Sequence, residues 1–359
     1  MWGRLPARLQ GIVANRRLDG FPSDAIRLHV LSELVALGRI RRGADHQTTF
    51  HRRNGEFQKA IQISELERAD VVVGFDTSAW ILTERCRDLG IPLILDQTTS
   101  HPDSKTRIFE QMRMSEPSWT ERVELRDSKV RAAEQREHEG ATIVVVASSF
   151  ARRTLIENGV SESKIRVNAL GVDCERFASA TNCVNRPFRF VFVGIISARK
   201  GVRLLLEAWR YLKPRAGELW LVGHAERHVL SGIPDVAGLR YLGPKPHAEI
   251  PGILKQCDVL VFPSYFEGFG LVILEAMACG IPVITTSATA GPDIYSDGEG
   301  GWITPPGDVV ELTRVMRGCL ENRAGVVEAG RMARGIAEGF SWTAYGNRWM
   351  RILEDARAI

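Results

Sequence analysis

The chain has 359 residues, of which 44% are apolar and 25% are charged, and its net charge is +4. This balance is typical of a soluble globular protein and argues against a disordered or fibrous chain. No stretch holds the roughly 18–20 uninterrupted apolar residues of a membrane span, and the N-terminal segment has no apolar core of signal-peptide length. The length fits two domains of roughly 150–200 residues each, and we expect a cytoplasmic protein.

The positive charge is concentrated near the N-terminus, where residues 1–60 hold eleven Lys or Arg side chains and five acids. Two interpretations remain open: an ordinary solvated surface, or peripheral adhesion to the anionic inner face of a membrane. No nucleic-acid-binding motif accompanies the charge, so no nucleic-acid partner is expected. The six cysteines form no C-x-x-C pair, which predicts small buried residues rather than disulfides or a zinc site.

Short apolar runs alternate with longer amphipathic segments, which is the pattern of βα repeats and a parallel sheet. In the first half, strands are predicted at 71–75, 92–96, 142–146 and 165–168. Helices are predicted at 78–89, around 121–138 and at 149–158, with 24–37 as a further candidate. Ser148 or Ser149 is expected to cap the last of these helices, and Gly159 to end it.

The second half repeats the pattern more strongly. Strands are predicted at 189–193, 219–222, 240–242, 259–262 and 282–285, and helices at 202–212, 248–256, 271–279, 309–321 and 342–356. The polar stretch 179–187 lacks periodicity and is the predicted linker between domains at 1–178 and 188–340, with 341–359 as a C-terminal helix. Ligands in such folds bind beyond the carboxyl ends of the strands, so the loops there are candidates for chemistry.

The strand predicted at 259–262 runs into a glycine-rich loop and then an apolar helix. The glycines allow a ligand to approach the backbone closely, and the free N–H groups at the start of the helix favour an anion such as phosphate. The candidate ligand-binding residues of this segment are Glu267, Gly268, Phe269, Gly270, Leu271 and Val272.

Glu275 is a carboxylate within the otherwise apolar helical segment that follows this loop. A helix that is apolar all round is normally buried, and a lone buried carboxylate is costly unless something donates hydrogen bonds to it. The hydroxyl pair of a sugar is a suitable donor. The alternative interpretation is a Glu on a narrow exposed stripe or one paired with a core Arg.

A second candidate loop follows the strand predicted at 189–193. Gly194 closes this strand, and Arg199 and Lys200 stand at the start of the next helix. Two cations beside a helix N-terminus can clamp a diphosphate, and the alternative is a solvated basic turn. Both candidate loops follow strands of one predicted sheet, which favours a common site.

His101 follows the strand predicted at 92–96. A histidine at this place could bind a substrate hydroxyl or stabilise developing charge, and a surface loop histidine is the alternative. The other seven histidines show no metal-ligand spacing, so no metal site is predicted.

Several motifs occur in a fixed order: FVGIISARKGVRLLLEAW, ELWLVG, YLGPKPHAEIPGILKQCDVLVFPSYFEGFGLVILEAMACGIPVITT and GPDIYSDGEGGWITPPGD. They include an E-x7-E pair, Glu267 and Glu275, and are preceded by IVVVASSFARRTLIENGVSESKIRVNALGVDCERF. By these motifs the chain, from about residue 70 to its C-terminus, resembles the retaining GT-B glycosyltransferases of the family-4 type, the glycosyl transferases group 1.

The resemblance implies an α/β fold of two Rossmann-like parallel-sheet domains facing a cleft. It also implies transfer of a hexose, with retention, from a nucleotide-diphosphate sugar to a glycan or lipid-linked acceptor in polysaccharide or glycolipid assembly. Glu267 would bind the donor-sugar hydroxyls, Glu275 the ribose hydroxyls and Lys200 the diphosphate, with help from the loop N–H groups. His101 would correspond to the cleft histidine. No tightly bound metal or other cofactor is implied.

Two departures from the family pattern stand out. Many members carry an Arg after the glycine of the first strand in the second domain, where this chain has Ile195, and Arg199 is expected to take its place. Members also open with a strand and a glycine-rich loop, which 1–40 lacks, so the N-terminal domain is expected to be reduced or truncated. A catalytically weak or inactive sugar-nucleotide-binding paralogue is therefore the alternative function. A dinucleotide oxidoreductase is disfavoured because no G-x-G-x-x-G follows a strand.

Overall fold

The computed structural model describes residues 30–120, 125–178, 186–213, 217–225, 229, 233 and 236–359. The chain divides into two compact units, Met1–Ala60 and Ile61–Ile359. In its described part, the first unit consists of helices α2 (Val30–Arg41) and α3 (His46–Ala60). Helix α2 overlaps the helix predicted at 24–37, of which residues 24–29 lie outside the described part of the chain.

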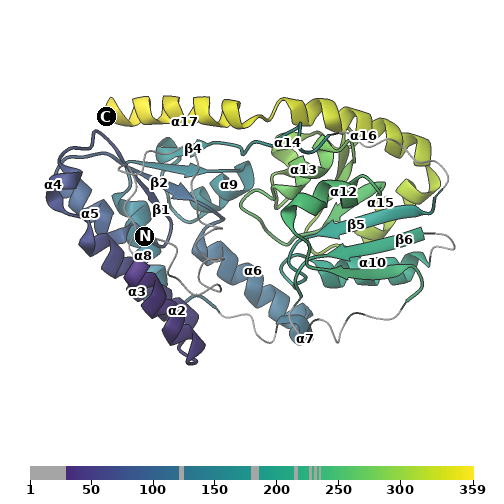
Figure 1. Ribbon diagram of the computed structural model, residues 1–359, viewed down its shortest axis with the longest axis horizontal. Helices are drawn as coiled ribbons and strands as arrows, with labels where there is room; N and C mark the ends of the chain where they lie inside the picture. Colours follow the sequence, from purple (N-terminus) through teal and green to yellow (C-terminus); the bar gives the residue numbers. More distant parts are fainter. Residues whose placement is uncertain are drawn as a thin grey trace, which may run out of the picture. The chain divides into compact units, whose positions relative to one another are not determined.

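The second unit contains two parallel sheets, which confirms the predicted α/β fold class (Figure 1). We call the part that carries the first sheet the first-sheet region (residues 61–178) and the part that carries the second sheet the second-sheet region (residues 186–340). The predicted linker falls mostly on residues 179–185, which lie outside the described residues.

The first sheet has the order β1-β2-β3-β4. Its strands agree with the four predicted ones to within one residue at each end: β1 (Val72–Phe75), β2 (Leu93–Gln97), β3 (Ile143–Val146) and β4 (Ile165–Val167). The central strands β2 and β3 bury mainly aliphatic side chains, as expected for a parallel sheet covered on both faces, whereas Val73 and Phe75 of the edge strand β1 are exposed.

The helices of the first-sheet region are α4 (Ile63–Leu66), α5 (Trp80–Asp88), α6 (Pro102–Ser115), α7 (Pro117–Thr120), α8 (Ser128–Gly140) and α9 (Ser149–Glu157), and η2 (Glu162–Lys164) is a 3-10 turn. Ser148 caps α9 by accepting a hydrogen bond from the N–H of Ala151, and Gly159 follows its end with φ +89°, both as predicted. Helix α6 is absent from the sequence-based prediction because it is mostly polar and buries few side chains.

The second sheet has the order β10-β9-β8-β5-β6-β7. Its strands are β5 (Phe188–Val193), β6 (Gly217–Val222), β7 (Leu239–Gly243), β8 (Val259–Phe262), β9 (Val283–Thr286) and β10 (Gly301–Thr304). From β5 the chain builds one edge through β6 and β7, and then returns to place β8 on the other side of β5. The direction of strand addition therefore reverses between β5 and β8.

The second-sheet region and the C-terminus contain α10 (Val202–Leu212), η3 (His247–Glu249), α12 (Ile250–Leu254), α13 (Val272–Ala278), α14 (Gly291–Ile294), α15 (Val309–Glu321), α16 (Arg323–Glu338) and α17 (Trp342–Arg357). Helices α10 and α15 have the bounds predicted from the sequence, whereas β10, α14 and α16 were not predicted. Fully buried aromatic side chains, among them Phe190, Phe192, Trp209 and Phe262, form the core of this region.

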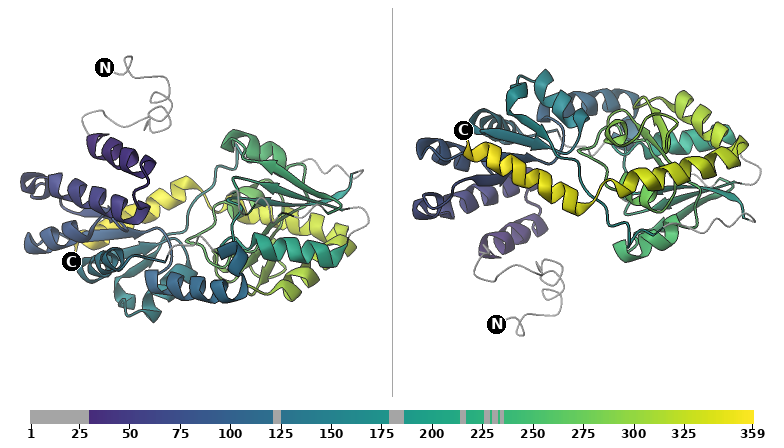
Figure 2. Two further views of the ribbon diagram at one scale, coloured as in Figure 1. Left: turned by 90° about the horizontal axis from the view of Figure 1, so that it is seen from below. Right: turned by 90° about the horizontal axis from the view of Figure 1, so that it is seen from above.

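Helix α17 leaves the second-sheet region and packs on the first sheet (Figure 2). Its Ile352 and Ala356 share one buried cluster with Ile94 of β2 and with Ile143 and Val145 of β3. The C-terminal helix thereby ties the two sheets together by apolar burial. Four of the five cysteines in the described part of the chain are buried, as predicted. Among the described residues, no helix has the length and apolar character that crossing a bilayer requires.

Candidate functional site

The reversal between β5 and β8 is where open parallel sheets usually bind ligands, because the loops leaving the two strands diverge there. The two candidate loops of the sequence leave these two strands and lie against each other. The N–H of Tyr265 donates to the carbonyl oxygen of Arg199 at 2.9 Å. A Cβ atom on Gly201, which has φ +68°, would lie 2.0 Å from the carbonyl oxygen of Pro263. Only glycine therefore allows this approach of the two loops.

Glu267 lies at the centre of this contact, and its side chain is only 10% exposed. Its Oε1 atom is 2.6 Å from Nζ of Lys200 and 2.8 Å from Nη1 of Arg199. The sequence therefore predicts correctly that the basic turn and the acidic loop meet. Together, the carboxylate of Glu267 and the two cations have a net positive charge, which suits an anionic ligand.

The two cations are held in place rather than solvated. The side chain of Lys200 is 13% exposed, and its Nζ lies 4.7 Å from the ring centre of Phe262. Arg199 lies over the ring of Phe266 and donates to the carbonyl oxygen of the same residue at 2.9 Å. Burial lowers the pKa of Lys200, and the neighbouring Glu267 opposes this shift. The alternative of a solvated basic turn is therefore wrong.

The glycine-rich loop touches the first-sheet region. A Cβ atom on Gly268 would lie 2.0 Å from the carbonyl oxygen of Thr98, which follows β2. The hydroxyl of Ser148, after β3, donates to the carbonyl oxygen of Gly268 at 2.7 Å. Gly270 has φ +91°, and Leu271 takes the N-cap position of α13, a helix of seven residues that starts at Val272. The glycine-rich loop therefore contacts the first-sheet region at Gly268 and continues into helix α13 of the second-sheet region.

Phe269 and Gly194 have their polar backbone groups engaged within the second-sheet region. The carbonyl oxygen of Phe269 accepts from the N–H of Ala290 at 3.0 Å, and the N–H of Gly194 donates to the carbonyl oxygen of Val222 at 2.9 Å. Ile195, which stands where many relatives carry an Arg, is 54% exposed. Phe269 and Gly194 thus contribute to the shape of their loops through backbone hydrogen bonds. The cationic charge of the site comes from Arg199 and Lys200.

Glu275 is buried in the first turn of α13, and its partner is a histidine. Its Oε1 atom lies 2.7 Å from Nε2 of His247, whose side chain is 54% exposed. The ring of His247 in turn lies 5.7 Å from that of Phe177. Neither sequence-based alternative, an exposed stripe or a core Arg, applies. No hydrogen bond or ion pair joins Glu275 to Arg199 or Lys200 in the described chain, so the two acids belong to separate clusters.

His247 is a candidate site residue that the sequence analysis missed. It follows β7 at the carboxyl edge of the second sheet, the same signal that singled out the other loops. The spacing of the histidines bears only on metal ligation and therefore does not single out His247. In the described part of the chain no group of three or more His, Cys, Asp or Glu is arranged to hold a metal ion.

His101 takes the N-cap position of α6. Its Nδ1 accepts a hydrogen bond from the N–H of Asp103 at 3.2 Å, and its ring stacks on that of His138 with centroids 5.0 Å apart. No hydrogen bond, ion pair or ring contact connects it to Glu267, Arg199 or Lys200 within the described residues. Its catalytic role stays a prediction of the sequence.

A second contact between the two regions involves Glu116, directly after α6. Its carboxylate is 1% exposed and accepts a hydrogen bond from the hydroxyl of Tyr265, in the glycine-rich loop. Nε of Arg203, on α10, lies 3.2 Å from the same oxygen. Burial raises the pKa of Glu116. No sequence pattern marks this residue, because its partners are distant in the chain.

The chain is similar in sequence to known glycosyltransferases. Residues 187–322 match the family model described as "Glycosyl transferases group 1". The chain is 27% identical over 210 residues to the amylovoran biosynthesis glycosyltransferase AmsK of Erwinia amylovora, covering 55% of this chain and 52% of that protein. It is 28% identical over 251 residues to D-inositol 3-phosphate glycosyltransferase of Corynebacterium jeikeium, covering 63% and 60%. The chain thus spans between half and two thirds of the length of these relatives.

The fold is shared with solved GT-B structures. The crystal structure of HepE from Anabaena in complex with UDP superimposes with a TM-score of 0.65 at 20% identity, covering 82% of this chain and 80% of that one. The resemblance drawn from the sequence motifs is thereby confirmed for the GT-B fold and, over residues 187–322, for the glycosyl transferases group 1 family. Over residues 187–322, the chain carries a domain of the glycosyl transferases group 1 family, within a fold of the GT-B class.

Proposed function

We propose that the chain is a retaining glycosyltransferase. It would transfer a hexose from a nucleotide-diphosphate sugar to a glycan or lipid-linked acceptor in polysaccharide or glycolipid assembly. The observation that carries the proposal is the buried Glu267 with Arg199 and Lys200, at the point where the strand order reverses. The amylovoran relative and the UDP complex of HepE support a nucleotide-sugar donor and a glycan product.

The charges of the cluster suit this chemistry. As the bond from the anomeric carbon to the diphosphate breaks, negative charge grows on the phosphate oxygen, and Lys200 and Arg199 are already fixed to stabilise it. The bond from the acceptor oxygen forms on the same face, and the departing phosphate oxygen takes the acceptor proton. Glu267 would hold hydroxyls of the donor sugar. Because the cations come from the chain, we expect the reaction to need no tightly bound metal.

The pair of Glu275 and His247 would bind the nucleoside. Glu275 can accept hydrogen bonds from the two ribose hydroxyls, and His247 fixes the orientation of its carboxylate. The exposed ring of His247 leaves this pair accessible to a ligand. The phosphate and ribose ends of a nucleotide would thus contact separate clusters of the second-sheet region.

Transfer can be tested by measuring nucleoside diphosphate released from UDP-, GDP- and ADP-hexoses, with and without p-nitrophenyl glycosides of glucose, galactose and mannose as acceptors. We expect release that depends on the acceptor, and a product with the anomeric configuration of the donor by NMR. Glu267→Gln should lower the rate by about 10²–10³-fold, the loss typical of one transition-state-stabilising group. Glu328→Gln, which breaks an exposed ion pair with Arg331, should leave the rate unchanged.

A nucleotide that stabilises the fold, by about 2.7 kcal/mol at 100 times its dissociation constant, without turnover of any acceptor would support the sugar-nucleotide-binding alternative instead. A product of inverted configuration would contradict retention while leaving glycosyl transfer intact.

A further inference from the structure

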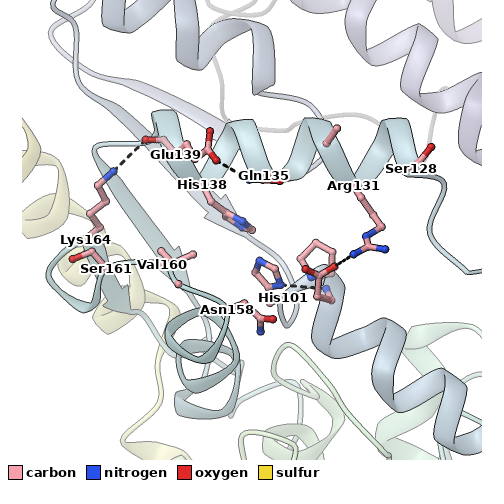
Figure 3. Close-up of a pocket in the computed structure, with 14 residues that line it drawn as sticks. His101, Ser128, Arg131, Gln135, His138, Glu139, Asn158, Val160, Ser161 and Lys164 are labelled. Atoms are coloured by element: carbon pink, nitrogen blue, oxygen red, sulfur yellow. Dashed lines mark hydrogen bonds and ion pairs between the residues drawn. The ribbon is translucent and has the colours of Figure 1, made fainter.

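The first-sheet region contains a cavity of about 680 Å³ that the proposed transfer reaction does not use (Figure 3). It lies between the N-terminus of α6, one face of α8 and the segment after α9, and all its lining residues fall between His101 and Lys164. Its size is within the range of small-molecule sites. Among the residues that the structure describes, none of the second-sheet region lines it, so it is separate from the Glu267 cluster.

Two buried imidazoles lie side by side in the wall of this cavity. His101 and His138 are 8% and 6% exposed, and their rings are stacked. Burial lowers the pKa of both, that of His138 to about 3, so both rings are neutral at physiological pH. Each neutral ring has one N–H donor and one acceptor nitrogen.

The partners of the two rings fix which nitrogen carries the proton. Nδ1 of His101 accepts from the N–H of Asp103, so its proton is on Nε2. Nε2 of His138 lies 2.9 Å from Oε1 of Gln97, an amide oxygen that can only accept, so its proton is also on Nε2. The amide of Gln97 is oriented by a hydrogen bond from its Nε2 to Asp76. His101 therefore keeps a free donor at Nε2, and His138 a free acceptor at Nδ1.

Neither of these two nitrogens has a hydrogen-bond partner among the described residues, and both rings line the cavity (Figure 3). Polar atoms in such a wall form hydrogen bonds with water or with a ligand. One hydroxyl group, which donates and accepts at once, complements the N–H of His101 and the lone pair of His138 together. A phosphate oxygen, which only accepts, would satisfy the first and leave the second unpaired.

The charges around the cavity cancel. Arg131 forms an ion pair with Asp103, and Lys164 donates to the carbonyl oxygen of Glu139, whose own carboxylate accepts from Gln135. Two cations thus face two carboxylates, and the lining has no net charge to attract an anion.

We propose that this cavity binds a neutral saccharide of one or two rings, with one hydroxyl bridging Nε2 of His101 and Nδ1 of His138. The site goes beyond the proposed transfer function, because its lining lies wholly in the first-sheet region and its occupancy does not depend on turnover.

The test uses the full chain and NMR of the histidine side chains, with maltose, cellobiose, lactose and α-1,2-mannobiose as probes. We expect at least one disaccharide to shift the resonances of His101 and His138 in a saturable manner. Gln135→Trp, an exposed position on the cavity wall, should weaken that binding at least tenfold by filling the cavity. Lys129→Trp, on the same helix but outside the lining, should bind as the unmodified chain does.

Ser161→Trp, on the opposite wall, serves as a second blocking variant should the first fold poorly. Both blocking variants should keep the stabilisation by UDP, GDP or ADP, which separates this site from the proposed donor site. The proposal is overturned if none of the four disaccharides shifts the two histidines, if binding survives both blocking variants, or if inorganic phosphate competes with the disaccharide.

Discussion

At the level of single residues, the candidate site rests on a compensated buried charge. Glu267 is nearly inaccessible and is flanked by Lys200 and Arg199, and each of the three would be costly to bury alone. The net charge of these three side chains is positive, so a bound diphosphate would neutralise the remaining positive charge. The burial that lowers the pKa of Lys200 also strengthens its attraction to a bound anion, because solvent screening is weak there.

Lys200→Met keeps most of the side-chain length and removes one cation. We expect nucleotide binding to weaken by about 10–100-fold, since a hydrogen bond to a charged group contributes roughly 1.5–3 kcal/mol. Calorimetry with UDP, GDP and ADP measures the change. Lys129→Met on the exposed face of α8 is the control. Equal affinity of the Lys200 variant and the unmodified chain for whichever nucleotide binds would remove Lys200 from the diphosphate site.

At the level of elements, α6 links the first-sheet region to the glycine-rich loop. Glu116 at its end accepts from Tyr265, and Phe109 within it packs edge-on against Phe266, with ring centroids 5.3 Å apart. Both partners immediately precede Glu267 in the loop. The helix therefore restrains the loop that carries the candidate catalytic carboxylate, although it belongs to the other sheet.

Tyr265→Phe removes the hydroxyl that donates to the buried Glu116. Among the described residues the carboxylate then keeps only Arg203 as a partner, and we expect a loss of about 1–3 kcal/mol in the free energy of unfolding. Urea-induced unfolding measures this difference. Tyr241→Phe removes a hydrogen bond to Gly223 from an exposed tyrosine and should change the stability by less. Similar losses in the two variants would show that Glu116 gains little from Tyr265.

At the level of the whole molecule, the second unit contains neutral buried histidines in its first-sheet region. Burial lowers the pKa of His138 from 6.5 to about 3 and also lowers that of His101. Between these limits the unfolded chain binds more protons than the folded one. The stabilisation is therefore complete above the ordinary histidine pKa and is lost as the pH falls through this window, by up to about 1.4 kcal/mol per pH unit for each histidine.

His138→Gln should make the free energy of unfolding less dependent on pH between about pH 6.5 and 4.5, by close to one proton, because glutamine does not titrate. Urea unfolding at several pH values measures the slope for the variant and for the unmodified chain. His46→Gln, at an exposed position of α3, is the matched control. An unchanged slope in the His138 variant would mean that this ring is already protonated in the folded state.

Local sequence patterns predict every described strand except β10, several of the helices and one of the two clusters at the candidate site. Apolar β-branched runs specify strands locally. Ligand-binding loops follow the carboxyl ends of parallel strands, and this rule predicts that Glu267 lies near Arg199 and Lys200. The match of α10 and α15 to their predicted bounds has the same origin, because their helical periodicity is complete within a few turns.

The partners of the other polar groups follow from the tertiary fold. Glu275 meets His247 from 28 positions away, and Tyr265 meets Glu116 from 149 positions away. The stacked pair of His101 and His138 likewise depends on how α6 and α8 pack. Such contacts leave no periodic signal, because each depends on the fold of the intervening chain. Sequence patterns report local backbone preference and burial, whereas the choice of a hydrogen-bond partner is made when distant segments come together.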